Sequence, residues 1–178
     1  VIVEVYTLSI LSLMGVLVCL MRWVYIPERK RYLYWAFFLF GICFNNHQTL
    51  IVAAMGIEVA IAATNLKLGR DLFMINSIVY ILGLLAKWNG MVTSFDENFA
   101  LFVIYNAVGI ASLGAFAWAW NKTQAVMTEW RPVLILTLAW LVGASFYFYM
   151  PIASSTNPPM NWAYPRTWDG FMHAFSRG

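Results

Sequence analysis

The chain has 178 residues, of which 62% are hydrophobic and 11% charged, and its net charge is +3 at neutral pH. A water-soluble domain carries roughly a quarter charged residues, so this composition excludes a soluble globule and indicates a protein embedded in a bilayer. The basic residues are scattered between apolar runs and form no stripe with interleaved aromatics, which excludes a nucleic-acid-binding surface. No cysteine and histidine spacing suggests a metal site, and we expect no cofactor.

Six apolar segments follow one another along the chain, and none shows the alternation of a β-strand. In lipid the backbone polar groups must be satisfied internally, so these segments predict helices. We therefore expect an all-α fold, a multi-pass transmembrane bundle over residues 1–150. The first segment is closed by Pro27, and Pro132 suits the first turn of the last helix. The predicted bounds are residues 1–26, 32–44, 49–64, 72–88, 99–120 and 132–150.

The second and third segments are short and are separated by a polar stretch, residues 45–48 (NNHQ). A thirteen-residue helix reaches about 20 Å, whereas the hydrocarbon core is about 30 Å thick. A single helix over residues 32–64 would reach about 50 Å, which is too long for one span without a steep tilt. We prefer two short helices that meet at a turn, and one merged span is the alternative.

The distribution of positive charge favours six spans with the start of the chain outside. This topology places most Lys and Arg residues on the inner side and leaves only Lys87, Arg166 and Arg177 outside. The polar stretch 45–48 and residues 151–178 then lie on the extracytoplasmic side. Because the sequence starts inside an apolar run and stops just after a short helical pattern, we expect it to be a segment of a longer protein.

The C-terminal tail, residues 151–178, is predicted to be an extracytoplasmic loop followed by a short interfacial helix. Thr167 is the expected N-cap of a helix that runs from Trp168 to about Ser176. One face of this helix is apolar and the other polar, which is typical of a helix lying on the membrane surface. It is either an aromatic anchor or a lid whose polar residues face a site, namely Arg166, Asp169, His173 and Arg177.

Several polar residues lie within or beside the apolar segments. Glu4, near the outer end of the first span, faces either a site or the headgroup region. Asn45, Asn46 and His47 are expected to form the outer turn, where His47 binds an anion or acts as a base, or where the asparagines cap the third helix. Glu58 lies deeper, and we interpret it as a structural hydrogen-bond partner.

Four short motifs, taken in order, resemble a known family. They are residues 4–9 (EVYTLS), 41–49 (GICFNNHQT), 157–162 (NPPMNW) and 176–178 (SRG). In this order the sequence resembles the protein O-mannosyltransferase-like family of GT-C membrane glycosyltransferases, long catalogued as a domain of unknown function. The resemblance spans essentially the whole chain, and the NPPMNW motif is its most specific part.

The resemblance implies a GT-C-like enzyme of the bacterial inner membrane or the endoplasmic reticulum. Such an enzyme transfers a sugar from a polyprenyl-phosphate donor to a protein or glycan hydroxyl on the extracytoplasmic face. The catalytic acidic residue is expected in an outer loop that would precede Val1, so the catalytic residue is unknown and this segment alone is expected to be inactive. Ala153 stands where the family has a charged residue, which moves a phosphate-holding role to Arg166 or Arg177.

The expected partners are membrane lipid, the lipid-linked sugar and the acceptor. The alternative function is a non-catalytic membrane bundle, such as a transporter half or a subunit of a membrane complex, and Glu58 favours it. We predict donor binding by His47, Arg166 and Arg177, and substrate binding by Glu4, Asn45, Asn46, Trp162, Asp169 and His173.

Overall fold

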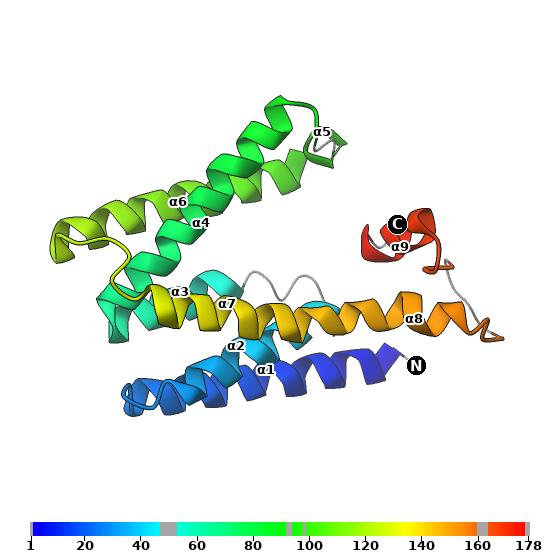
Figure 1. The fold of residues 1–178 in the computed structure, drawn as a ribbon, viewed down its shortest axis with the longest axis horizontal. Coiled ribbons are helices and arrows are strands. Elements are labelled where there is room, and N and C mark those ends of the chain that lie inside the picture. Colours follow the sequence, from blue (N-terminus) through cyan, green and yellow to red (C-terminus); the bar gives the residue numbers. More distant parts are fainter. Residues whose placement is uncertain (1, 47–52, 92–93, 98, 160–163, 177–178) are drawn as a thin grey trace.

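A computed structural model describes the chain except for residues 1, 47–52, 92–93, 98, 160–163 and 177–178. The described residues form helices and short connections, with no β-strand among them. Helices α1 and α7 run nearly parallel to the long axis of the molecule, whereas α4 is steeply inclined to them (Figure 1). The helices are α1 Ile2–Tyr25, α2 Arg31–Asn46, α3 Ala53–Thr64, α4 Leu66–Trp88, α5 Ser94–Glu97, α6 Phe99–Thr123, α7 Trp130–Ala144, the 3-10 helix η2 Ser145–Phe148, α8 Tyr149–Ser155 and α9 Trp168–Ser176.

Four stretches are long and apolar enough to cross a membrane, which supports the prediction of a helical membrane protein. Helix α2 has 16 residues and α3 has 12, so neither reaches that length in the described part of the chain. The count of six spans therefore stays a prediction. The four candidate spans are Thr7–Tyr25, Leu66–Trp88, Phe99–Thr123 and Trp130–Ser155.

The two ends of the bundle carry different parts of the chain. The connections α1–α2, α3–α4 and α6–α7 lie toward one end, whereas the start of α1 and helix α9 lie toward the other (Figure 1). Two contacts join the connections at the first end: Lys30 pairs with Glu129 at 3.1 Å, and Arg70 donates to Thr123. The basic connections predicted to share the inner side are thus together at one end.

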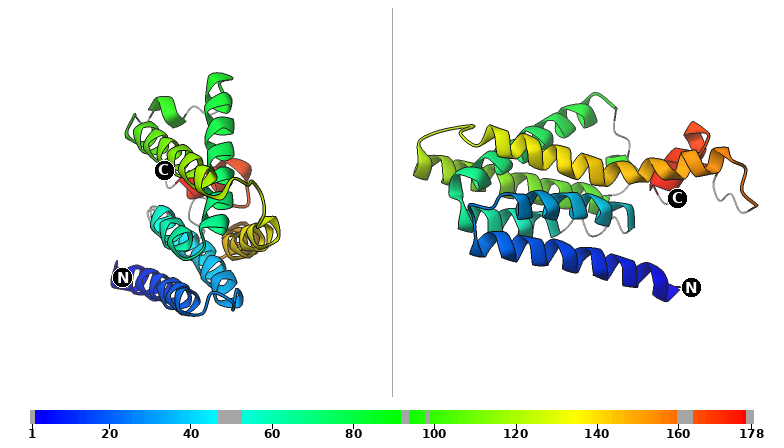
Figure 2. Two further views of the ribbon diagram at one scale, coloured as in Figure 1. Left: turned by 90° about the vertical axis from the view of Figure 1, so that its left-hand side faces the viewer. Right: turned by 60° about the horizontal axis from the view of Figure 1, so that its bottom comes forward.

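Helix α2 lies between α1 and α7 and forms the centre of the core (Figure 2). Val16 and Trp23 of α1, Leu33 of α2 and Leu136 of α7 are all buried in one apolar cluster. Because lipid is as apolar as these side chains, packing rather than exclusion from water holds such helices together. Close packing therefore depends on how near the backbones approach.

Glycine allows that approach where α2 crosses α7. A Cβ atom at Gly41 would collide with the carbonyl oxygen of Trp140, and one at Gly143 with the carbonyl oxygen of Phe38. Helices α3 and α4 meet in the same way, because a Cβ atom at Gly69 would collide with Ala62. Small residues at helix crossings are the usual means of close association in membranes.

Several helix ends differ from the sequence-based prediction by one to three residues, and two differ by five or six. Helix α4 begins at Leu66 rather than Leu72, and Asn65 caps it by accepting a hydrogen bond from the Leu68 N–H at 3.1 Å. The last span continues beyond Met150, because η2 follows α7 and leads into α8, which ends at Ser155. Pro151 does not end it, because Pro151 lies in the first turn of α8, where its missing N–H is not needed.

Candidate functional site

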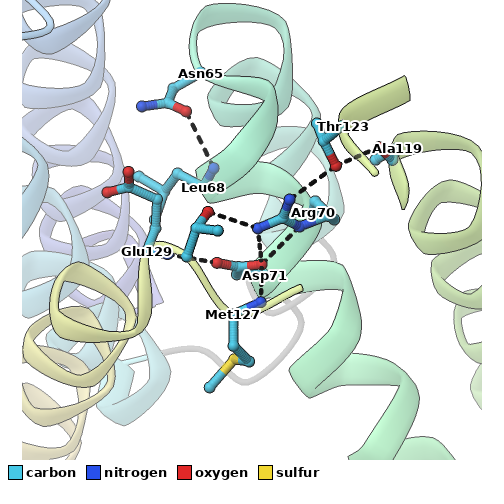
Figure 3. A network of polar contacts seen from close by, with 9 residues as sticks. Asn65, Leu68, Arg70, Asp71, Ala119, Thr123, Met127 and Glu129 are labelled. Carbon is cyan, nitrogen blue, oxygen red and sulfur yellow. Dashed lines mark hydrogen bonds and ion pairs between the residues drawn. The ribbon is translucent and has the colours of Figure 1, made fainter. Parts of the chain in front are cut away.

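The most connected polar group in the described part of the chain is the pair Arg70–Asp71 in the first turns of α4 (Figure 3). Both side chains are 0% exposed, and their closest N–O distance is 2.6 Å. The Arg70 guanidinium also donates to the hydroxyls of Thr123 and Thr128, each at 2.8 Å. Arg70 thus ties α4 to the end of α6 and to the α6–α7 connection.

Asp71 completes the same network with both carboxylate oxygens, of which Oδ1 also pairs with Arg70. Its carboxylate accepts hydrogen bonds from the backbone N–H groups of Met127 at 3.1 Å and Glu129 at 2.7 Å (Figure 3). Met127, in the α6–α7 connection, has a φ of 55°, so its backbone adopts the left-handed conformation next to the carboxylate. Because the network uses these donors and acceptors within the protein, we assign it a structural role.

Asn45 does not lie in an outer turn, as the sequence suggested, but in the last turn of α2. Its side-chain N–H donates to the carbonyl of Gly143 at 2.9 Å and to that of Gly41 at 3.2 Å. The amide is therefore drawn to the α2–α7 crossing and does not cap α3. Its Oδ1 atom is buried and has no hydrogen-bond partner among the described residues, so Asn45 retains an acceptor.

The tail helix has the bounds that the sequence predicted, Trp168–Ser176. Thr167 caps it, because its Oγ1 accepts a hydrogen bond from the Gly170 N–H at 3.1 Å. The helix packs back on the end of the last span: Phe171 stacks on Phe148 with ring centroids 6.0 Å apart, and the Tyr147 hydroxyl donates to the Ala174 carbonyl at 2.9 Å. These contacts anchor α9 on η2.

Arg166 lies in the loop between α8 and α9 and is exposed. Its backbone N–H donates to Ser154 Oγ at 3.2 Å, and its guanidinium donates to Asn157 Oδ1. The guanidinium carbon also lies 5.8 Å from the ring centre of Tyr164. The loop therefore holds Arg166 in place while the side chain stays accessible to solvent or to an anion.

Of the nine residues predicted to bind donor or substrate, four have described side chains, namely Asn45, Arg166, Asp169 and His173. Asp169 and His173 are exposed on α9, near Arg166 in sequence, and no contact between described residues joins Arg166 to Asn45. The polar residues of the tail and those at the α2–α7 crossing thus form two separate groups in the described part of the chain. The other five residues lie outside the described residues or have side chains that are not described: Glu4, Asn46, His47, Trp162 and Arg177.

A pocket of about 200 Å³ lies among α2, α3, α4 and α7. Glu58 on α3 and Asn76 on α4 are polar groups in its lining, and Glu58 is 8% exposed. The Asn76 side-chain N–H donates to Glu58 Oε2 at 2.6 Å, which confirms Glu58 as a hydrogen-bond partner within the bundle. Asn76 has no signal of its own in the sequence, because only the packing of α3 on α4 brings it beside Glu58.

Comparisons of this chain with protein-family models, with curated proteins and with solved structures give no match. The likeness to GT-C glycosyltransferases rests on the four sequence motifs. Three of them include residues outside the described part of the chain, at 47–49, 160–162 and 177–178. Among the described residues, the main groups available for binding a ligand are Arg166, Asn45 and the Glu58 pocket.

Proposed function

We propose that the chain is part of a membrane glycosyltransferase that moves a sugar from a polyprenyl-phosphate donor to a protein or glycan hydroxyl on the extracytoplasmic face. The observation that carries the proposal is the folded tail. An exposed arginine is held beside the end of the last span, and a short helix packs back on that span instead of extending away. A lipid-phosphate donor needs a cationic group of this kind at the membrane edge, with apolar surface nearby for its prenyl chain.

Arg166 is the proposed phosphate-binding residue among those described. A guanidinium binds phosphate oxygens in a fork of charge-assisted hydrogen bonds and stabilises the charge that develops on the leaving phosphate. His47 and Arg177 are proposed to assist it. Asp169 and His173 of α9 are proposed to line the acceptor side, and Asn45 is proposed to belong to the substrate-binding set. Glu4, Asn46 and Trp162 complete the proposed substrate-binding set.

The decisive experiment replaces Arg166 with Ala in the complete protein that contains this chain. A charge-assisted hydrogen bond contributes about 1.5–3 kcal/mol. We expect kcat/KM for a polyprenyl-phosphate sugar to fall by roughly 10- to 150-fold, since about 1.4 kcal/mol is tenfold. Lys122→Ala is the matched control, because Lys122 is exposed at the opposite end of the bundle and should leave kinetics unchanged.

Two outcomes contradict this assignment. Transfer rates of Arg166→Ala within about twofold of wild type, with an unchanged melting temperature in detergent, mean that the tail is an interfacial anchor. Turnover by the isolated 178-residue segment means that the catalytic acid does not lie outside it.

A non-catalytic membrane bundle, such as a transporter half or a subunit of a membrane complex, is the second candidate. The Glu58 pocket favours it, because an acidic group within a helical bundle commonly marks a ligand or ion pathway. The two candidate functions predict that different substitutions abolish activity. An enzyme loses transfer activity with Arg166→Ala, whereas a transport or subunit function depends on Glu58.

A further inference from the structure

The Glu58 pocket contains a carboxylate that lacks a positive partner among the described residues. None of the ion pairs between described residues includes Glu58, and its one hydrogen bond there comes from the neutral amide of Asn76. Arg70 lies less than two turns before Asn76 on the same helix, but its guanidinium is engaged by Asp71, Thr123 and Thr128. A buried carboxylate is stable when it is paired with a positive group or holds a proton.

The walls of the pocket are suited to a cation of a particular kind. Phe37, Phe40 and Trp140 line it, and the faces of aromatic rings attract positive charge, most strongly the face of Trp. No group of three or more His, Cys, Asp or Glu residues in the described part of the chain forms a metal site. Metal ions such as Ca²⁺ need several oxygen ligands, whereas an organic ammonium needs one counter-ion and aromatic walls.

The size of the pocket sets a limit on the ligand. Its volume of about 200 Å³ is below the roughly 300–1,000 Å³ of pockets that hold drug-sized ligands. A small amine of a few carbon atoms fits that space, and a sugar nucleotide or a long peptide does not. The lining is mostly apolar with a few convergent polar groups, as is usual in ligand sites.

We propose that this pocket binds a small organic ammonium group, either free or as the head group of a lipid. Glu58 is the counter-ion, Asn76 holds its carboxylate in place, and Phe37, Phe40 and Trp140 surround the ammonium. The site is separate from the proposed donor site on the tail and does not depend on glycosyl transfer, so either can fail without the other.

Choline and its neutral isostere 3,3-dimethyl-1-butanol test the site directly. The two molecules have the same shape and differ in one positive charge. The complete protein is purified in a maltoside detergent, which has no ammonium group, and its melting temperature is measured against ligand concentration. We expect choline to raise the melting temperature saturably, by roughly 3 to 6 °C at ten times its Kd. No shift with choline, or equal shifts with both molecules, overturns the proposal.

Variants locate the binding and distinguish the source of the ligand. Glu58→Gln keeps an acceptor for Asn76 and removes the charge, so choline should bind at least tenfold more weakly. Glu28→Gln, at an exposed loop position, should bind choline as wild type does. Choline binding that persists in Glu58→Gln overturns the assignment. If Glu58→Gln fails to fold, the comparison of choline with its isostere on the wild-type protein decides.

The lipid environment separates the two sources of the ammonium group. In nanodiscs of phosphatidylcholine, a site that takes a lipid head group is already filled, so added choline gives no further stabilisation. In nanodiscs of phosphatidylglycerol, which has no ammonium, choline again stabilises the protein. A site for a free amine responds to choline in both.

Discussion

Asp71→Ala is predicted to be among the most destabilising single substitutions in the described part of the chain. The change leaves the Arg70 guanidinium buried without its counter-ion, and removes the acceptor for the Met127 and Glu129 N–H groups. Breaking a buried ion pair costs about 3–5 kcal/mol. For a protein of this length about 1 kcal/mol lowers the melting temperature by roughly 2–4 °C, so we expect a fall of roughly 6 to 20 °C.

Two further substitutions calibrate that value. Arg70→Met should lower the melting temperature less, because Asp71 keeps its two backbone N–H donors. Lys30→Met removes the Lys30–Glu129 pair, whose side chains are 39% and 24% exposed, and should cost less than about 1 kcal/mol. With the partly exposed Cys19 replaced by Ser, a thiol-reactive dye measures unfolding in detergent, since Cys43 is buried in the folded protein. If Asp71→Ala lowers the melting temperature no more than Lys30→Met does, the structural role assigned to the network is wrong.

Gly41→Ala should lower the melting temperature, because the added Cβ collides with α7 at the α2–α7 crossing. Gly56→Ala, with open space around it, is the control and should be neutral or stabilising by about 0.5–1 kcal/mol. Equal effects of the two substitutions on the melting temperature would contradict the close crossing. The sequon Asn121-Lys122-Thr123 should stay unmodified in a glycosylating host, because the six-span topology places it on the cytoplasmic side, and a glycan detected there by mass spectrometry would overturn that topology. Thr167→Ala should remove the N-cap of α9 at a cost of about 1 kcal/mol and speed hydrogen exchange in residues 168–176. Thr156→Ala is the control, because Thr156 caps no helix N-terminus.

Local features of the sequence were sufficient for several parts of the fold. Long apolar runs without alternation predicted helices, because a membrane leaves the backbone few other ways to satisfy its hydrogen bonds. Pro27 marked the end of α1, which stops at Tyr25, and Phe99 marked the start of α6. Thr167 and the apolar face that follows it were sufficient to place α9, since an N-cap acts on the next three residues.

Where hydropathy and helix-ending residues conflicted with packing, the local pattern was misleading. Arg70 and Asp71 interrupt the apolar run, so the predicted start of α4 came after them, yet they belong to the helix because their partners lie on the α6–α7 connection. The predicted last span stopped at Met150, whereas α8 continues to Ser155 and holds Pro151 in its first turn, a position that tolerates proline.

The sequence by itself determined that the chain is helical with runs apolar enough to cross a membrane, where most of its helices lie and that its tail ends in an amphipathic helix. Only the tertiary structure decided which polar groups meet. Asn45 bonds to a carbonyl 98 positions away, and Glu58 to an amide 18 positions away on the next helix. Hydropathy and capping are properties of neighbouring residues, whereas hydrogen-bond partners and pockets depend on which helix faces pack together, and that packing is set by close backbone contacts such as Gly41 against Gly143.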